Sequence, residues 1–463
     1  MTESSDRVAG AVVRLREQGT KTLIVAGADT YGMMRGKRLP TGQAARAFDH
    51  GIPMSDVFWV MHIDEMDIVA RPEGHAGYFP TEKEGYPDIL AVADLATLRP
   101  VPWHERTAIV LADFALQDGR PVPIAPRTVL KGVVERARRM GFEPRCGVEL
   151  EFFLLRETYT SLQARRAGDL TFYHGRPATY GVVTGSAQEP VARVIREAML
   201  DHGLTVEACN MENGPGQFEM NLRYADPVAA ADAAFLFKSG VKEIAVQNDL
   251  VATFMAKPHP VWSGNSCHFH LSLAGEDGRN AFFDEAAPKG ISTTMRYFIG
   301  GIQATMRELT AIHAPTINSY RRYVPYSWAG TTATWGIDNR SAGIRAVCEG
   351  DDGTRVEHRQ AGGDVNPYLG AAAALAAGLH GIEHEIEPDE AVATDVYALP
   401  AGAVTPVPRS LEEATELLAS SDMAREWLGD ELVAYYAAIK RAEVEAFART
   451  VTDWEIGRYA EAL

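Results

Sequence analysis

Four short stretches of this 463-residue chain place acidic, histidine and arginine side chains at every second position. Alternate side chains of a β-strand share one face, so each stretch would offer a row of polar groups over an apolar side. The stretches are Cys146–Leu155, Gln217–Tyr224, Ser266–Leu273 and Thr354–Gln360, and their polar members are Glu149, Glu151, Glu219, Asn221, Arg223, His268, His270, Ser272, Arg355, Glu357 and Arg359. A single such row is most often the solvated face of an amphipathic strand. Four rows that contain no lysine predict a sheet curved around a polar cavity.

The side-chain types in these rows are suited to metal-assisted phosphoryl transfer. Glutamates with one or two histidines favour Mg²⁺ or Mn²⁺, which prefer oxygen ligands. Arginines on neighbouring strands would hold phosphate or carboxylate groups. Metals, arginines and acids in one cavity are the equipment of phosphoryl transfer. The chain has neither a GxxxxGK[ST] loop nor a dinucleotide fingerprint, so a nucleotide would be bound in another way.

The elements around these rows predict two domains of an α+β protein. Strands are expected at Thr22–Ala28, Ile89–Val92, Leu98–Pro102 and Ala108–Ala112, and a proline-rich piece, Pro121–Pro126, then leads into a helix at Arg127–Met140. This switch predicts domains at residues 1–118 and 119–463. Apolar periodicity predicts further helices at Glu189–His202, Ala229–Gln247, Thr293–Ala314 and Val365–His384. The C-terminal stretch, Ser410–Leu463, predicts charged amphipathic helices that form a surface layer or a subunit contact.

Composition excludes several other classes of protein. The formal net charge of −17 and the absence of a basic stripe argue against nucleic-acid binding. No stretch approaches the roughly 20 apolar residues that a membrane helix needs, and the N-terminus does not resemble a signal peptide. The four cysteines are far apart in sequence, which speaks against structural zinc and favours a reduced, cytoplasmic setting.

Six sequence blocks together resemble the glutamine synthetase family, in its type I-like branch. The blocks are G-V-E-L-E-F-F at Gly147–Phe153, N-M-E-N-G-P-G-Q-F-E at Asn210–Glu219, G-N-S-C-H-F-H-L-S-L at Gly264–Leu273, N-S-Y-R-R at Asn318–Arg322, W-G-I-D-N-R-S-A-G-I-R at Trp335–Arg345 and R-V-E-H-R at Arg355–Arg359. Their order and spacing are highly specific. The resemblance implies a small N-terminal β-grasp domain followed by a catalytic domain with a curved antiparallel sheet and helices.

The resemblance also implies a role for each matching residue. The implied ligands of two metal ions are Glu151, Glu212 and Glu219 for one ion and Glu149, His268 and Glu357 for the other. Arg322, Arg359 and the backbone at Gly264 match groups that hold glutamate. Nucleotide-binding positions are matched by Glu207, His270, Ser272 and Arg355. Arg340 and Arg345 match arginines near the transferred phosphoryl group. The implied cofactors are therefore ATP with two or more Mg²⁺ or Mn²⁺ ions.

Two departures from the family pattern concern the nitrogen nucleophile. Ammonia-using members carry a glutamate in a P-G-Y-E-A-P loop, where this chain reads V-P-Y-S-W-A-G with Trp328 at that position. They also carry an aspartate in an F-D-G-S-S segment, which M-S-D-V-F at Met54–Phe58 does not reproduce, although Asp56 is available as a substitute. A lesser change is Asn210 and Met211 in place of a histidine pair.

The resemblance and its departures predict an ATP-dependent ligase that joins the γ-carboxylate of glutamate to an organic amine through a γ-glutamyl phosphate. A small amine such as ethanolamine is favoured and a polyamine is the other choice, as in the family's γ-glutamylethanolamide and γ-glutamylpolyamine synthetases. The alternatives are an ammonia-using glutamine synthetase and a non-catalytic sensor or scaffold. Family members form rings of subunits, so a dodecameric homo-oligomer is expected from the resemblance. Tyr397 lies in a loop resembling the adenylylated loop of some members, but a packed loop tyrosine is the preferred interpretation.

Overall fold

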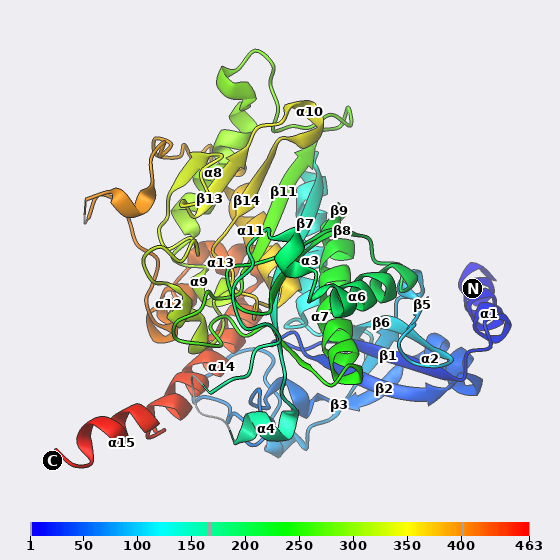
Figure 1. Cartoon of the computed structure of the whole chain (residues 1–463). Coiled ribbons are helices and arrows are strands. Elements are labelled where there is room, and N and C mark those ends of the chain that lie inside the picture. Colours follow the sequence, from blue (N-terminus) through cyan, green and yellow to red (C-terminus); the bar gives the residue numbers. More distant parts are fainter. Residues whose placement is uncertain (1, 165–168, 401, 463) are drawn as a thin grey trace.

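The computed structural model describes residues 2–164, 169–400 and 402–462 of the chain. It contains two β-sheets with helices packed around them, which confirms the α+β class. In Figure 1 the sheet of the N-terminal strands lies below the larger sheet, and α7 (Pro227–Gln247) runs beside both. A continuous hydrophobic core extends through both sheets and their helices.

The N-terminal sheet has the strand order β2-β1-β6-β4-β3, with β5 paired to β6. Strand β1 runs parallel to β6, whereas the other pairs are antiparallel. The elements are α1 (Thr2–Glu17), β1 (Thr22–Ala28), β2 (Met34–Pro40), α2 (Ala44–His50), β3 (Ile52–Ser55), β4 (Asp88–Ala93), β5 (Arg99–Pro100) and β6 (Thr107–Ala115). A parallel pair made by the first and last strands, with a helix in the connection, is the arrangement of a grasp-like domain.

The larger sheet has the strand order β12-β13-β14-β11-β7-β9-β8, with β10 paired to β7. Its strands are β7 (Glu143–Leu155), β8 (Val206–Met211), β9 (Gln217–Ala225), β10 (Val251–Thr253), β11 (Cys267–Ala274), β12 (Trp335–Ile337), β13 (Ile344–Val347) and β14 (Arg355–His358). The pairs are antiparallel except β12 with β13, which is parallel, so the sheet is predominantly antiparallel as expected. Each of the four predicted rows lies on one of β7, β9, β11 and β14.

Helices cover the larger sheet and close the core. They are α3 (Pro126–Arg139), α4 (Tyr159–Gln163), α5 (Val182–Gly185), α6 (Glu189–Asp201), α7, α8 (Thr293–Thr305), α9 (Thr310–His313), α10 (Gly350–Gly353), α11 (Pro367–Glu383), α12 (Leu411–Ala419), α13 (Asp422–Leu428), α14 (Asp430–Ala448) and α15 (Asp453–Tyr459). The Asn366 side chain accepts the first free N–H groups of α11, and Pro367 occupies the first helical position. No helix in the described part of the chain has both the length and the apolar character needed to cross a membrane.

Two predicted helical segments differ from the structure. The helix expected over Thr293–Ala314 is divided into α8 and α9. Near the division, the hydroxyl groups of Thr305 and Thr310 donate to the carbonyl oxygens of Gly301 and Met306, each four residues earlier. Such hydroxyl bonds compete with the backbone ladder and bend helices.

The C-terminal stretch is expected to form charged amphipathic helices of a surface layer or a subunit contact, but the first half of α14 lies inside the protein. Every residue from Tyr435 to Lys440 is buried, and Tyr435 donates a hydrogen bond to the carbonyl oxygen of Trp59 in the N-terminal region. The Tyr435 hydroxyl also lies 3.0 Å from the Thr30 hydroxyl. Helix α14 therefore connects the C-terminal helices to the N-terminal domain. Sequence periodicity does not reveal this, because the hydrogen-bond partners of its aromatic residues lie far away in the chain.

Candidate active site

The pairing of strands brings the four polar rows together on one face of the larger sheet. His268 of β11 lies opposite Glu149 of β7, and Glu149 lies opposite Asn221 of β9. Two residues further along β7, Glu151 lies opposite Glu219 of β9. Cross-strand neighbours of this kind have Cβ atoms about 5 Å apart, so their polar ends can share ligands. The rows that the sequence predicts separately thus form one continuous polar surface.

The first group on this surface consists of Glu149, His268 and Glu357, whose ligand-type atoms all lie within 4.8 Å of one another. Nδ1 of His268 lies 2.6 Å from Oε1 of Glu149 and 3.4 Å from Oε1 of Glu357. The Asn221 amide donates to the other Glu149 oxygen at 2.9 Å. Burial opposes ionisation of Glu149, yet the adjacent His268 and His270 hold its pKa well below the usual value. This group offers two ionised carboxylates and an imidazole at one point.

Two arginines compensate the charge of Glu357, which is only 1% exposed. Nη1 of Arg345 donates to Oε2 of Glu357 at 2.8 Å, and Arg359 donates to Oε1. Arg345 is itself held by Asp338, at 2.6 Å. Burial works against the charged form of Glu357, but the Arg359 charge and the nearby histidines lower its pKa. The carboxylate is therefore ionised in place.

The second group, Glu151, Glu212 and Glu219, lacks such compensation. Oε2 of Glu151 accepts the Ser266 N–H at 2.7 Å and lies 3.3 Å from the Gln217 amide. Burial and then mutual repulsion between the carboxylates raise the pKa values of Glu151 and Glu219, and burial raises that of Glu212. Buried carboxylates that repel each other suit a divalent cation, since its charge would allow all of them to ionise together.

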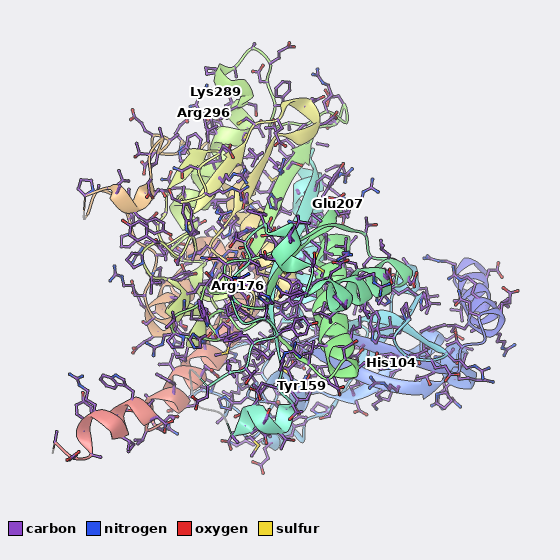
Figure 2. All side chains as sticks on the ribbon, in the orientation of Figure 1. His104, Tyr159, Arg176, Glu207, Lys289 and Arg296 are labelled. Atoms are coloured by element: carbon purple, nitrogen blue, oxygen red, sulfur yellow. The ribbon has the colours of Figure 1, made fainter. Side chains whose placement is uncertain are left out.

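A cavity of about 620 Å³ lies next to the first group. Its lining includes Glu207, His270, Ser272 and Arg355, the four residues predicted to bind nucleotide. Glu207, labelled in Figure 2, occupies an irregularity in the pairing of β8 with β9, and such bulges redirect side chains. A cavity of this size is within the range of small-molecule sites. Arg345 does not line it and instead lies against Glu357.

The residues predicted to hold glutamate occupy two different environments. Arg322 is 1% exposed and donates to the carbonyl oxygens of Gln360 and Ala361, both at 2.9 Å. These bonds tie its guanidinium to the chain that leaves β14. A Cβ atom added at Gly264 would lie 2.4 Å from the Ala256 carbonyl oxygen, so only glycine fits this approach. Arg359, by contrast, lies at the polar face, against Glu357.

Trp328 lies in a loop with other aromatic residues, and its backbone is close to Arg359. One terminal nitrogen of Arg359 lies 3.5 Å from the Trp328 carbonyl oxygen, and the Trp328 N–H donates to the Tyr397 hydroxyl at 2.9 Å. The rings of Tyr326 and Tyr397 lie 5.1 Å apart. Both Tyr326 and Trp328 have φ near +59°, an uncommon conformation for bulky residues. The Trp328 side chain is about half exposed and its ring lies 6.3 Å from that of Tyr397, so the loop presents aromatic side chains to solvent while the Trp328 carbonyl reaches Arg359.

Of the predicted catalytic residues, Asp56 lies apart from these groups, whereas Arg340 acts on one of them through its charge. Asp56 is buried in the N-terminal domain, where its Oδ2 accepts the Tyr78 hydroxyl at 3.2 Å. Burial raises its pKa to about 6. Arg340 is exposed, and its charge acts on Glu212. None of the contacts described for Asp56 involves the polar rows.

Sequence reasoning missed two residues that organise the site. The Gln217 amide reaches the Gly264 carbonyl oxygen at 2.9 Å and the Asn265 side chain at 3.0 Å, beside Glu151. Gln217 lies two residues before Glu219, so strand alternation could have predicted that its side chain faces the site. Asp338 positions Arg345, and no pattern in the sequence indicates that pairing.

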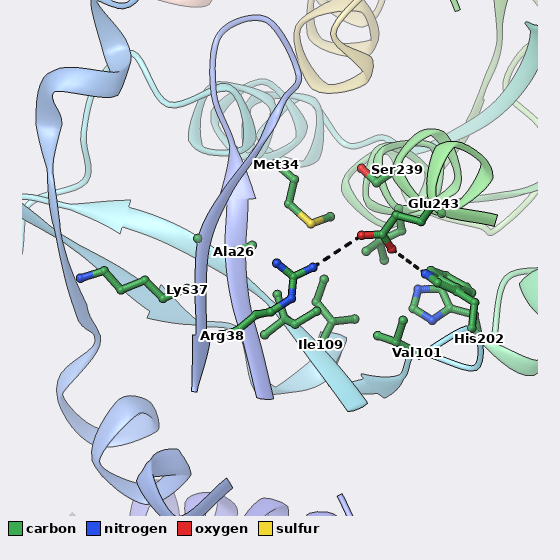
Figure 3. A pocket seen from close by; sticks show the side chains of 14 residues that line it. Ala26, Met34, Lys37, Arg38, Val101, Ile109, His202, Ser239 and Glu243 are labelled. Atoms are coloured by element: carbon green, nitrogen blue, oxygen red, sulfur yellow. Dashed lines mark hydrogen bonds and ion pairs between the residues drawn. The ribbon is translucent and has the colours of Figure 1, made fainter. Parts of the chain in front are cut away.

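A separate cavity of about 220 Å³ lies between the N-terminal sheet and α7. Arg38 and Glu243 face each other across it, 3.6 Å apart, as Figure 3 shows. The Trp103 indole donates to Glu243 at 2.6 Å. None of the predicted site residues lines this cavity, so the polar rows are the stronger candidate for the reaction site.

Comparisons with known proteins agree with this geometry. The family model of the glutamine synthetase catalytic domain matches residues 123–459. A γ-glutamylethanolamide synthetase of Streptomyces coelicolor is 40% identical over 447 residues, covering 96% of this chain and 93% of that protein. A glutamate–isopropylamine ligase of a Pseudomonas species is 38% identical over 379 residues, covering 82% of this chain and 83% of that protein. The solved structure of a GmaS–ADP complex has a TM-score of 0.84 at 30% identity and covers 97% of this chain and 99% of that chain.

Proposed function

The chain belongs to the glutamine synthetase family, and from this premise we propose that it is an ATP-dependent ligase of glutamate and an organic amine. The γ-carboxylate of glutamate would be joined to the amine nitrogen as an amide. Two relatives named for ethanolamine and isopropylamine products support an organic amine over ammonia. The intact set of acidic, histidine and arginine residues at the polar face argues against a non-catalytic sensor or scaffold.

The observation that carries the choice of nucleophile is the environment of Trp328. Ammonium is small and charged, so its binding calls for a carboxylate that holds the cation and accepts a proton. A tryptophan offers an apolar face and at most a cation–π contact. That face can pack against the carbon atoms of an amine such as ethanolamine. A polyamine is the second candidate, since Asp64 and Glu65 of the N-terminal domain carry additional carboxylates.

The family uses ATP and divalent metal ions, and the donor set of this chain fits Mg²⁺ or Mn²⁺. Two sites are proposed, one held by Glu149, His268 and Glu357 and the other by Glu151, Glu212 and Glu219. Nε2 of His268 is buried and has no hydrogen-bond partner among the described residues, so this imidazole has an unused nitrogen. When bound, the ions would neutralise negative charge on the phosphates and on the transferring phosphoryl group.

The residues of the chain would then bind, orient and stabilise the reactants in two steps. Glu207, His270, Ser272 and Arg355 hold the nucleotide in the 620 Å³ cavity. Its γ-phosphoryl group passes to the γ-carboxylate of glutamate, which Arg359, with Arg322 and the Gly264 backbone, would orient. Arg340 and Arg345 stabilise the negative charge of the transfer.

In the second step the amine nitrogen attacks the carbonyl carbon of the γ-glutamyl phosphate. The C–N bond forms, the C–O bond to phosphate breaks, and phosphate leaves. The nitrogen loses a proton, for which Asp56 is the proposed acceptor. A carboxyl group with a pKa raised to about 6 is suited to this role near neutral pH.

We also propose that subunits assemble in rings in which the N-terminal domain of one chain completes the site of its neighbour, with the domain boundary between residues 118 and 119. Asp56 is buried in its own domain and bonded to Tyr78, so a role toward a neighbouring subunit requires its carboxylate to be uncovered at the interface. Light scattering of the purified protein tests this, with twelve chain masses expected. A monomer would contradict both the ring and the role of Asp56.

The amine assignment is tested by phosphate release from ATP and glutamate with ammonium, methylamine, ethanolamine, isopropylamine, putrescine and spermine. Wild type is expected to have a higher kcat/KM for a small organic amine than for ammonium. Trp328→Glu should reverse that preference, because the new carboxylate can hold ammonium. The matched control is Trp454→Glu, another exposed tryptophan, on α15, which should leave the preference unchanged. A wild-type preference for ammonium would overturn the proposal.

A further inference from the structure

Two histidines lie four residues apart where α11 reaches the surface, away from the polar rows. His380 is half-buried in the last turn, and His384 is the exposed residue that caps the helix. The His384 N–H donates to the His380 carbonyl oxygen at 3.0 Å, which continues the helical geometry through both residues. Side chains four apart lie on one helix face, and these ring centroids are 4.4 Å apart. Two histidines at this spacing are a known arrangement for binding one metal ion.

A third ligand-type group comes from the neighbouring helix α13. The ligand atoms of Glu426 and of both histidines all lie within 4.8 Å of one another. Oε1 of Glu426 accepts a hydrogen bond from Arg136 of α3 at 2.6 Å, and Oε2 takes no part in that bond. Metal-binding carboxylates are commonly held through one oxygen by a second residue in this way. Arg136 therefore orients the carboxylate and leaves its other oxygen for an ion.

The charges around the two histidines and Glu426 favour binding of a cation, and neighbouring side chains restrict how these residues can move. Glu383 and Glu426 both bond to Arg136, so the three charged groups together carry a net charge of −1. The C-terminal end of α11 adds partial negative charge from its free carbonyl groups. The Trp427 ring packs edge-on against His380, with centroids 6.4 Å apart. Nδ1 of His380 is buried without a hydrogen-bond partner among the described residues.

We propose that His380, His384 and Glu426 bind one divalent transition-metal ion, with Zn²⁺ the preferred ion and water completing the coordination. Two imidazoles and one carboxylate are a common zinc ligand set, whereas Mg²⁺ is bound mainly by oxygen and this set offers oxygen from one carboxylate only. His384 and Glu426 are exposed, so they can rotate onto the ion at the usual bond lengths of about 2.0–2.2 Å. The ion would link α11 to α13 and, through Arg136, to α3.

Zinc binding to the full-length protein tests the proposal. Chelator-treated protein is dialysed against Zn²⁺ in excess Mg²⁺, which competes for the oxygen-rich polar face, and bound zinc is measured per chain. Wild type should bind one more zinc ion per chain than His384→Gln or Glu426→Gln. His50→Gln, at an exposed histidine in the last turn of α2, is the matched control and should bind as wild type does.

Two further measurements separate this site from the polar face. Co²⁺ should produce a visible absorption band of a tetrahedral nitrogen–oxygen site in wild type, and the band should be lost in His384→Gln. Zn²⁺ should raise the melting temperature of wild type and of His50→Gln but not of His384→Gln. The rate of glutamate–amine ligation in the presence of Mg²⁺ should be unchanged in His384→Gln, which shows that the variant is folded. Equal zinc content in wild type and His384→Gln would overturn the proposal.

Discussion

Two groups of glutamates on the same sheet face differ in how their charge is compensated. Glu149 and Glu357 lie among His268, Arg345 and Arg359, and their pKa values are lowered. Glu151 and Glu219 lie across one strand pair from each other, with other carboxylates nearby, and their pKa values are raised. Glu149 and Glu151 are two residues apart on β7, so the contrast arises within a single strand.

This contrast teaches that residue type and spacing do not determine ionisation. A glutamate beside a buried arginine is charged without any ligand, whereas a glutamate beside other glutamates needs a proton or a cation. The carboxylates of the first group are therefore ionised even when no metal is bound. Under the proposed metal assignment, the second group would ionise fully only when a cation is bound.

The largest expected effect is on activity and should be shared by both groups. Glu357→Gln and Glu219→Gln should each lower kcat/KM at least about 100-fold, since even residues that support a metal ligand cost 10–100-fold. The matched control is Glu276→Gln, at an exposed glutamate after β11, which should keep wild-type turnover. Retained turnover in Glu219→Gln would contradict the second metal site.

The two groups should respond with opposite signs when stability is measured in the presence of a chelator. Glu357→Gln leaves the buried Arg359 without its carboxylate partner, while Arg345 keeps Asp338, so it should cost about 3 kcal/mol of unfolding free energy. Glu219→Gln removes a repelled carboxylate and should raise the denaturation midpoint. Denaturant titrations of both variants with EDTA check this, and a shift of the same sign in both would contradict the contrast.

The pH dependence of stability should identify the uncompensated group. Glu151 and Glu219 have raised pKa values in the folded protein, so the folded state binds protons that the unfolded chain releases above about pH 4.5. The contribution of Glu151 and Glu219 to stability in EDTA should therefore be greatest below this pH and should fall as the pH rises toward their folded-state pKa values.

Added Mn²⁺ should remove much of this loss, because the ion takes the place of the protons. Glu219→Gln in EDTA should show a shallower decline than wild type. Melting temperatures at successive pH values from 5 to 9 provide the measurement. An equal slope in wild type and Glu219→Gln would mean that other groups cause the decline.

The smallest effect is expected at Asp338, whose side chain is 76% exposed and bonded to Arg345. Asp338→Asn should change kcat/KM less than about fivefold, since an exposed ion pair contributes at most about 1 kcal/mol. Steady-state kinetics with glutamate and ethanolamine would measure it. A larger loss would show that Glu357 depends on Asp338 through Arg345.

Much of the local structure could be predicted from the sequence. The strand Thr22–Ala28 agrees with β1 in both bounds, and the helices α3, α6, α7 and α11 begin and end within two residues of their predicted ranges. Apolar periodicity is a local property of the chain, so it reports such elements well. The division between α8 and α9 was missed, because hydroxyl bonds to carbonyl groups compete with a helix without changing the apolar pattern.

The sequence by itself determined which side chains share a face, because alternation along a strand follows from backbone geometry alone. It also determined the family, through six blocks in a specific order. Only the tertiary structure decided that His268 lies opposite Glu149 and Glu151 opposite Glu219, since register depends on contacts between segments far apart in the chain. It likewise decided that Arg345 and Arg359 meet Glu357, that Tyr397 holds Trp328, and that His380 and His384 meet Glu426. Ionisation follows burial and neighbouring charge, and both exist only once the chain is folded.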